Sequence, residues 1–241
     1  MMNALCDNET GICAAPALSA TAVADRKPKA NAEVIYVGDP MCSWCWGIEP
    51  ALRRIQDHCE ERGMGFSIVL GGLRPGGGDP WNSGFKAFLR QHWAEIGEAT
   101  GQPFSFGILD LEHFSYDTEP ACRAVATARH MLGDAAHSRR LYAIFAAIQR
   151  KFYVDGADPT RLGFYEDIIE AAGLDFARFA QLLASDAARE WARSDFALNR
   201  SWGVRGFPTL LVKTGDRLVP VATGFISPEA LIARVDAAIE A

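Results

Sequence analysis

Gly38-Asp39-Pro40-Met41-Cys42-Ser43-Trp44-Cys45-Trp46 is the stretch from which the fold of this chain can be worked out. Before it, residues 33–37 read Glu-Val-Ile-Tyr-Val, a β-branched and aromatic run that is typical of a buried strand. After it, Ile48, Leu52 and Ile55 recur at helical spacing. We therefore expect Cys42 and Cys45 to lie where a strand ends and a helix begins.

The spacing of these two cysteines predicts redox chemistry. Two thiols three residues apart in a first helical turn can close a small disulfide with little backbone movement. The free amides and positive dipole end of the helix, expected over residues 42–62, stabilise an anion such as the Cys42 thiolate. A thiolate is the attacking species in disulfide exchange. We interpret Asp39 as a helix cap rather than as a proton acceptor for Cys45.

Length and composition limit the function further. The chain has 241 residues, of which 49% are hydrophobic, enough for one large domain or a domain with an insertion. Its net charge of −6 argues against nucleic acid as a partner, because phosphate binding needs a basic face. The sequence has no apolar run of the ~20 residues that a membrane helix needs. We expect a protein without a nucleic-acid or membrane partner, a metal or a bound cofactor.

The first 32 residues read as a flexible tail rich in small and polar residues. Cys6 and Cys13 lie in this tail, separated by a turn-forming segment. They are interpreted as incidental thiols, as a second redox pair or as a metal clip. Ala22-Val23-Ala24 resembles a signal cleavage site, but no positive charge precedes it, so we expect a cytoplasmic protein rather than a periplasmic or exported one.

The remaining pattern predicts an α/β fold with an insertion. A strand at 66–72 would complete a parallel strand–helix–strand unit with the first strand. Residues 79–186 show helical periodicity without a strand signal and are too long for a loop, so we expect an inserted all-helical subdomain. The domain then has two parts, 33–78 and 187–241.

The second part of this domain is predicted to hold a strand pair and a closing helix. Runs at 209–213 and 217–223 flank a turn signal, and Ser227-Pro228 is typical of a helix start. Pro208 directly precedes the first of these strands, where proline would remove a ladder donor. A cis bond before Pro208 would explain that position by turning the chain sharply.

Together these features resemble the thioredoxin superfamily. The helical insertion indicates the DsbA-like branch, with a mixed sheet. Within that branch, Asp39 to Gly47 and the segment Tyr116-Asp117-Thr118-Glu119-Pro120-Ala121-Cys122-Arg123-Ala124 resemble the FrnE-type group of predicted protein-disulfide isomerases. The resemblance covers roughly residues 33–241. A Cys-x-x-Cys after a strand, combined with Gly206-Phe207-Pro208-Thr209, is a specific signal.

The resemblance implies roles for individual residues. Cys42 matches the exposed nucleophile and Cys45 the more buried resolving thiol, while Pro208 matches the cis-proline that faces them. Phe207 would pair its backbone with an extended client segment, and Ser43 and Trp44 would also contact the client. The implied function is disulfide oxidoreduction or isomerisation in client proteins that carry disulfides or dithiols, with a thiol or glutathione system that recycles the pair.

One residue departs from the strongly oxidising relatives, which have histidine where this chain has Trp44. Tryptophan offers no positive charge to hold the thiolate. We therefore expect a pair that is less oxidising than that of DsbA, nearer the reducing or isomerising end of the scale.

Three alternatives remain open. Cys6 and Cys13 could complete a structural zinc site with Cys42 and Cys45, although zinc would not explain Pro208. A glutathione-dependent isomerase or transferase could use the same scaffold, but such proteins typically place serine where Cys42 stands. A DsbA-like adaptor could deliver a regulator to a protease without redox chemistry. An apolar patch for clients would comprise Trp44, Trp46, Val204 and Phe207, with Trp46 equally suited to the core.

Overall fold

A computed structural model describes residues 32–133 and 139–240 of the chain. Within this part, four strands form one sheet in the order β2-β1-β3-β4. The strands are β1 (Ala32–Gly38), β2 (Gly65–Leu70), β3 (Thr209–Thr214) and β4 (Arg217–Thr223). β1 pairs parallel with β2 and antiparallel with β3, which pairs antiparallel with β4. The predicted mixed sheet is therefore confirmed.

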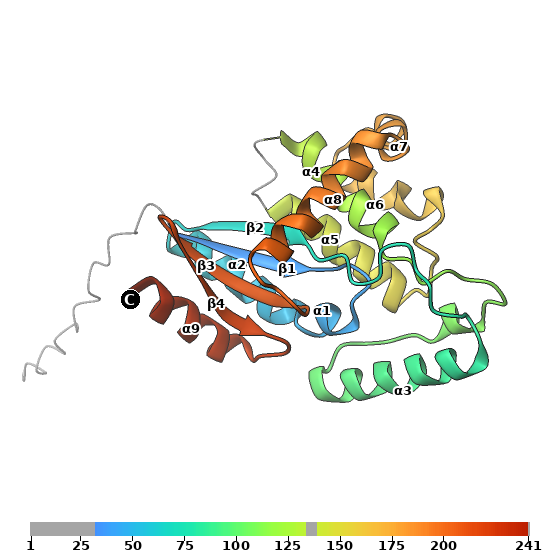
Figure 1. The fold of residues 1–241 in the computed structure, drawn as a ribbon, viewed down its shortest axis with the longest axis horizontal. Helices are drawn as coiled ribbons and strands as arrows, with labels where there is room; N and C mark the ends of the chain where they lie inside the picture. Colours follow the sequence, from blue (N-terminus) through green and yellow to red (C-terminus); the bar gives the residue numbers. More distant parts are fainter. Residues whose placement is uncertain (1–31, 134–138, 241) are drawn as a thin grey trace, which may run out of the picture.

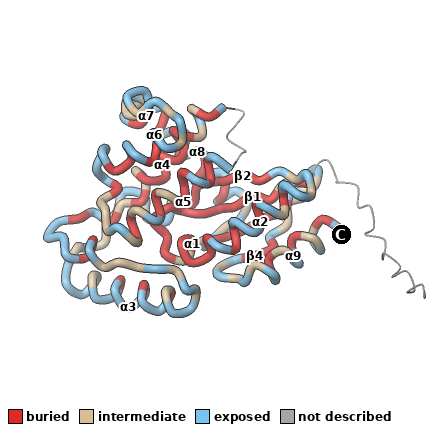
Figure 2. Tube along the Cα trace, turned by 180° about the vertical axis from the view of Figure 1, so that it is seen from behind, coloured by how far each residue is buried: buried red, intermediate tan, exposed pale blue. Residues whose placement is uncertain are grey.

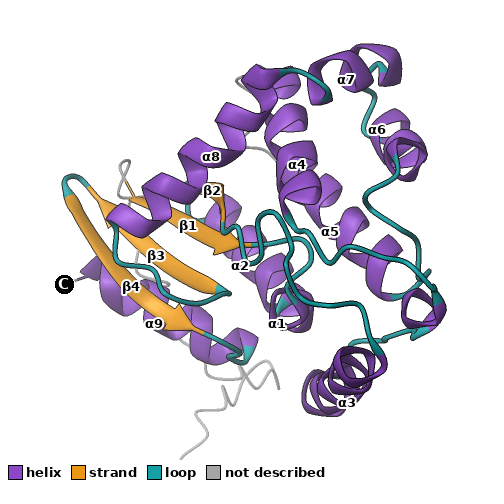
Figure 3. Ribbon diagram, turned by 45° about the vertical axis from the view of Figure 1, so that its right-hand side comes forward, coloured by secondary structure: helices purple, strands orange, loops and turns teal. Residues whose placement is uncertain are grey.

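Helices cover both faces of this sheet (Figures 1 and 3). Helix α2 (Glu49–Glu61) and helix α9 (Pro228–Glu240) pack together on one face, while α8 (Asp186–Ser201) crosses the other beside β2. Alternate residues of β1 enter separate apolar clusters, since Val34 and Tyr36 join the main core whereas Ile35 and Val37 face the α8 side. A strand that is buried on both faces reads as a continuous apolar run, which is why residues 33–37 stood out in the sequence.

The chain between β2 and α8 is helical in the described residues. It contains the helices α3 (Ser83–Thr100), α4 (Glu119–Leu132), α5 (Arg139–Tyr153), α6 (Glu166–Ala171) and α7 (Phe176–Leu183), with short 3-10 helices at Gly107–Asp110 and Leu162–Tyr165. Helix α4 packs against α5, α7 and α8, and thereby joins this helical region to the sheet. Helix α3 contacts the short helix α1 (Ser43–Gly47).

Burial differs between these helices. Figure 2 shows buried residues along the strands and α5, whereas α3 is largely exposed. Helix α3 buries only Leu89, Trp93 and Ile96, and leaves Phe88 on the surface. None of the helices in the described residues is long and apolar enough to cross a membrane.

Candidate active site

The two cysteines lie where the sequence placed them, directly after β1. Cys42 is the N-cap residue of α1, and Cys45 lies within that helix. Helix α1 has only five residues, so the expectation of one continuous helix over 42–62 was wrong. Pro50 has no amide hydrogen and its ring clashes with the carbonyl four residues earlier, that of Trp46. The helix therefore breaks at Ile48, and the side-chain amide of Gln102 bonds the Trp46 carbonyl at 3.0 Å.

Pro208 lies beside this motif although 166 residues of sequence separate it from Cys42. The Phe207–Pro208 peptide bond is cis. The Cys42 thiol points at the Phe207 carbonyl, with 3.7 Å between sulfur and oxygen. The Phe207 ring in turn lies over Gly71, where an added Cβ would stand 2.8 Å from ring carbons. The glycine after β2 therefore leaves room for the loop that carries Pro208.

Both cysteines are more enclosed than a freely accessible nucleophile would be. Cys42 is 4% exposed and Cys45 is 0% exposed, and both are free thiols. The expectation of an exposed Cys42 was thus wrong in degree, although Cys42 is the more accessible of the two. Burial raises the pKa of Cys45 well above that of an ordinary thiol, and the neighbouring Cys42 adds to the effect.

Asp39 does not cap the helix, contrary to our expectation from the sequence. Its carboxylate accepts hydrogen bonds from the backbone amides of Met41 at 2.8 Å and Leu73 at 2.7 Å. The Cys122 thiol lies 3.3 Å from the same carboxylate. Burial raises the pKa of this fully enclosed acid. Asp39 therefore joins the cysteine loop to the loop that follows β2.

The helical region supplies further contacts to the motif that sequence reasoning missed. The Tyr116 hydroxyl donates to the Met41 carbonyl at 2.8 Å, and the Trp46 indole donates to the Pro103 carbonyl at 2.9 Å. The segment around Tyr116 had carried the family resemblance, so a signal existed without an assigned role. Residues 102–103 gave no signal, because they lie in an irregular stretch without periodicity.

The two tryptophans of the motif have different surroundings. Trp46 is 6% exposed and its ring stacks on Tyr153 with centroids 6.5 Å apart, so it belongs to the core rather than to a surface patch. Trp44 is half-buried and contacts the rings of His92 and Phe225, each at 6.3 Å.

The half-buried Trp44 belongs to a larger surface feature. His92 stacks on Phe88 at 5.6 Å, and Phe88 and Phe225 are 53% and 45% exposed. We call Phe88, His92, Trp44 and Phe225 the aromatic row. This row runs from α3 across α1 to the loop between β4 and α9.

The other candidate positions lie around this site or outside the described residues. Ser43 is buried at the start of α1, and Val204 and Phe207 are half-buried in the loop before β3. Cys59 is buried in α2, where burial raises its thiol pKa to about 12 and makes it unreactive. Cys6 and Cys13 lie outside the described residues.

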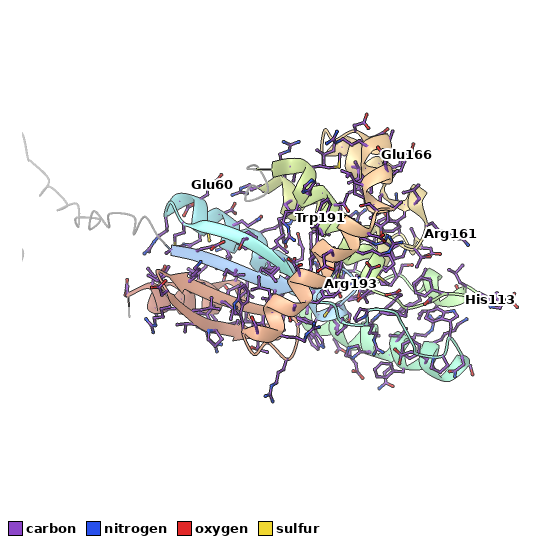
Figure 4. All side chains as sticks on the ribbon, turned by 45° about the horizontal axis from the view of Figure 1, so that its top comes forward. Glu60, His113, Arg161, Glu166, Trp191 and Arg193 are labelled. Carbon is purple, nitrogen blue, oxygen red and sulfur yellow. The ribbon has the colours of Figure 1, made fainter. Side chains whose placement is uncertain are left out.

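Two histidines outside the aromatic row have structural partners. His58 bonds Asp236 at 2.9 Å, and His130 stacks on Trp191 at 4.0 Å. His113 projects from the end of the molecule that is away from the sheet (Figure 4). Across residues 32–133 and 139–240, no group of three or more His, Cys, Asp or Glu side chains is arranged to hold a metal ion. A zinc site that includes Cys6 and Cys13 is not tested by these residues.

Comparison with known proteins gives a consistent picture. The family model of the DSBA-like thioredoxin domain matches residues 33–235. A solved structure from Nitrosomonas europaea, a candidate protein disulfide isomerase, is 32% identical and superposes with a TM-score of 0.77, covering 87% of this chain and 98% of that one. The cytosolic disulfide reductase DsbM from Pseudomonas aeruginosa, solved with GSH, is 25% identical with a TM-score of 0.66, covering 87% of this chain and 100% of that one.

A curated relative has a different described role. The ClpXP adapter protein SpxH of Shouchella clausii is 25% identical over 210 residues, which cover 86% of this chain. The matched part spans only 65% of that protein's length. The chain thus resembles both redox proteins and an adapter on one scaffold.

Proposed function

Since this chain belongs to the DSBA-like thioredoxin domain family, we propose that it exchanges disulfides with client proteins through Cys42 and Cys45. The observation that carries the proposal is the 3.7 Å approach of the Cys42 sulfur to the Phe207 carbonyl. This contact places the Cys42 thiol beside the backbone of the segment that precedes β3. An extended client could align with that backbone and so lie next to the reacting sulfur.

The proposed cycle has two exchange steps. The Cys42 thiolate attacks one sulfur of a client disulfide, a mixed disulfide forms, and the other client sulfur leaves as a thiolate. The Cys45 thiolate then attacks the Cys42 sulfur, which closes the Cys42–Cys45 disulfide and releases the second client sulfur. The client gains two electrons and the pair loses two. Cys45 is fully buried, so external thiols and disulfides exchange with Cys42.

The aromatic row supports a polypeptide client rather than a small disulfide alone. Exposed Phe88 and Phe225 lie on the two sides of Trp44, which follows Cys42 by two residues. Apolar surface beside a reactive group favours partners that bury it, and unfolded segments offer such side chains. Ser43, Phe207 and Pro208 complete the proposed client contacts.

Glutathione is the recycling thiol that we propose. One glutathione thiolate would attack Cys42 in the Cys42–Cys45 disulfide and release Cys45, and a second would then free Cys42 as oxidised glutathione leaves. Support comes from the similar DsbM, a cytosolic reductase that was solved with GSH. In a reducing cytoplasm, which we propose as the compartment, the cycle would run toward client reduction.

Cys6 and Cys13 are proposed as a second redox pair that exchanges with Cys42. A double Cys6→Ser/Cys13→Ser variant tests this. We expect slower turnover of client disulfides, with an unchanged first attack by Cys42. Unchanged turnover would identify the two thiols as incidental.

Insulin reduction tests the proposed function. We expect the wild type to reduce insulin with glutathione as the electron source and Cys42→Ser to be inactive. Cys59→Ser is the matched control, because Cys59 is also a buried free thiol but lies in α2 away from the motif. An inactive wild type would refute the oxidoreductase and favour the adaptor suggested by the SpxH similarity.

A further inference from the structure

Tyr36 carries a buried hydroxyl that the proposed cycle does not use. Its side chain on β1 is 0% exposed, and the hydroxyl has no hydrogen-bond partner in the described residues. The ring packs edge-on against Phe145 with centroids 5.5 Å apart. An unpaired buried hydroxyl is unfavourable, and phenylalanine would fill the same apolar space without that penalty. The presence of the oxygen therefore calls for an explanation.

The position of this hydroxyl provides one. It lies directly beneath Gly38, because a Cβ added to Gly38 would stand 2.2 Å from the Tyr36 oxygen. Tyr36 and Cys45 belong to the same buried cluster, and the hydroxyl lies near enough to the Cys45 thiol to lower the pKa of that thiol. The other groups that face Cys45 are the Cys42 thiol and the Asp39 backbone amide. Around Tyr36, the titratable neighbours are Cys45, Cys42 and Tyr142.

The resolving step places a negative charge at this spot. Cys45 must lose its proton before it can attack Cys42, and burial raises the pKa of Cys45 and so opposes that loss. Cys42, not Cys45, occupies the N-terminal end of α1. Burial also raises the pKa of Tyr36 well above that of an ordinary tyrosine, so its hydroxyl keeps the proton and is available to donate to an anion.

We propose that Tyr36 is a positioning residue for the resolving step, in which its hydroxyl donates a hydrogen bond to the Cys45 thiolate. The proton of Tyr36 is not transferred. The Cys45 proton goes to solvent, the Cys45–Cys42 bond forms, and the Cys42–client bond breaks as the client thiolate leaves and takes up a proton. This inference rests on the proposed function, because it concerns the second step of that cycle.

Tyr36→Phe tests the role. The reduced protein is mixed with a peptide that carries one disulfide, samples are quenched with acid, and mass spectrometry follows the Cys42 mixed disulfide. We expect the mixed disulfide to form at the wild-type rate and to resolve about tenfold more slowly, the effect of one hydrogen bond to a charged sulfur. Without this donor the Cys45 thiolate is less favoured, so the pH profile of resolution should move to higher pH.

Tyr153→Phe is the matched control. Its buried hydroxyl also has no hydrogen-bond partner in the described part of the chain, but its titratable neighbours are Tyr116, Cys42 and Asp39 and do not include Cys45. We expect this variant to form and resolve the mixed disulfide as the wild type does. Urea unfolding should show that neither phenylalanine variant is less stable than the wild type.

The outcomes separate the two proposals. A wild type that forms no mixed disulfide at Cys42 refutes the proposed function, and the inference with it. Normal wild-type kinetics combined with an unshifted pH profile in Tyr36→Phe refute the inference alone. Equal slowing in Tyr36→Phe and Tyr153→Phe, or a Tyr36→Phe variant that is only less stable, would also refute it.

Discussion

Beneath the Cys42–Cys45 motif, Asp39, Tyr116 and Cys122 form a closed polar network, whereas above it the aromatic row is open to solvent. We call these the inner side and the outer side. Asp39 and Tyr116 on the inner side bond backbone atoms, and Cys122 bonds the Asp39 carboxylate, so these buried groups are held in one geometry. Rings on the outer side contact one another without hydrogen bonds and can fit different partners. The inner side should therefore control the chemistry and stability of the site, and the outer side its choice of client.

The largest expected effect is on the inner side, at Asp39. Asp39→Ala would leave the Met41 and Leu73 amides unpaired in the interior, and we expect the free energy of unfolding to fall by about 2–4 kcal/mol. Urea denaturation measures the change. Asp117 is the control, because it also accepts from two backbone amides, those of Gly76 and Glu119, but is only half-buried. An equal loss in Asp117→Ala would contradict the special importance of the inner side.

The buried Asp39 carboxyl should also make the stability of the protein depend on pH. Burial raises the pKa of Asp39, so the folded protein holds this proton more firmly than the unfolded chain does. That contribution to stability is complete below about pH 3.9 and is lost as the pH rises through the folded pKa. We expect the wild type, relative to Asp39→Asn, to lose stability as the pH rises above about 4 and through the raised pKa of the folded protein. Unfolding curves that keep a constant difference across this range would show that Asp39 titrates as in the unfolded chain.

The next effect concerns Trp44, the member of the aromatic row that lies between the two cysteines in the sequence. Trp44→His would put a cation near the Cys42 thiolate and stabilise the reduced pair, so the pair should become more oxidising. We expect the equilibrium constant with glutathione to change about tenfold, which equals about 30 mV for two electrons. Trp44→Phe keeps the ring without the charge and should retain the wild-type equilibrium. If both variants shift alike, the loss of the indole rather than the charge sets the potential.

The strands, the position of the cysteine pair and the proline before β3 could be predicted because each is indicated by a short stretch of sequence. The β-branched run of β1, the cysteine spacing and the proline before β3 each specify a backbone feature within a few residues. The interior of the site could not be predicted in the same way. Asp39 was interpreted as a helix cap because helix caps are recognised from residues that are adjacent in the sequence. The groups that bond its carboxylate include the Leu73 amide and the Cys122 thiol, which are distant in the sequence.

The break between α1 and α2 shows a signal that was present but misjudged. Proline is compatible with the first turn of a helix, but a helix that starts at Cys42 would place Pro50 beyond its first turn. In the structure Pro50 belongs to the first turn of a second helix, α2. The side-chain amide of Gln102 donates to the Trp46 carbonyl that the helix break leaves without a partner in the helix. The sequence did not indicate this role, because it depends on how α3 packs against α1.

The smallest expected effect lies on the outer side. Phe88→Ser combined with Phe225→Ser removes the two exposed rings of the aromatic row without touching the inner side. We expect insulin reduction to weaken about fivefold, mainly through KM, because surface contacts of this kind each contribute modestly to binding. Reduction of cystine, which is too small to cover the row, should keep the wild-type rate. Leu162→Ser is the control, since Leu162 is 49% exposed but belongs to the 3-10 helix before α6. An equal loss on insulin and cystine would mean that the rings support the thiol geometry, and the division between the two sides would then fail.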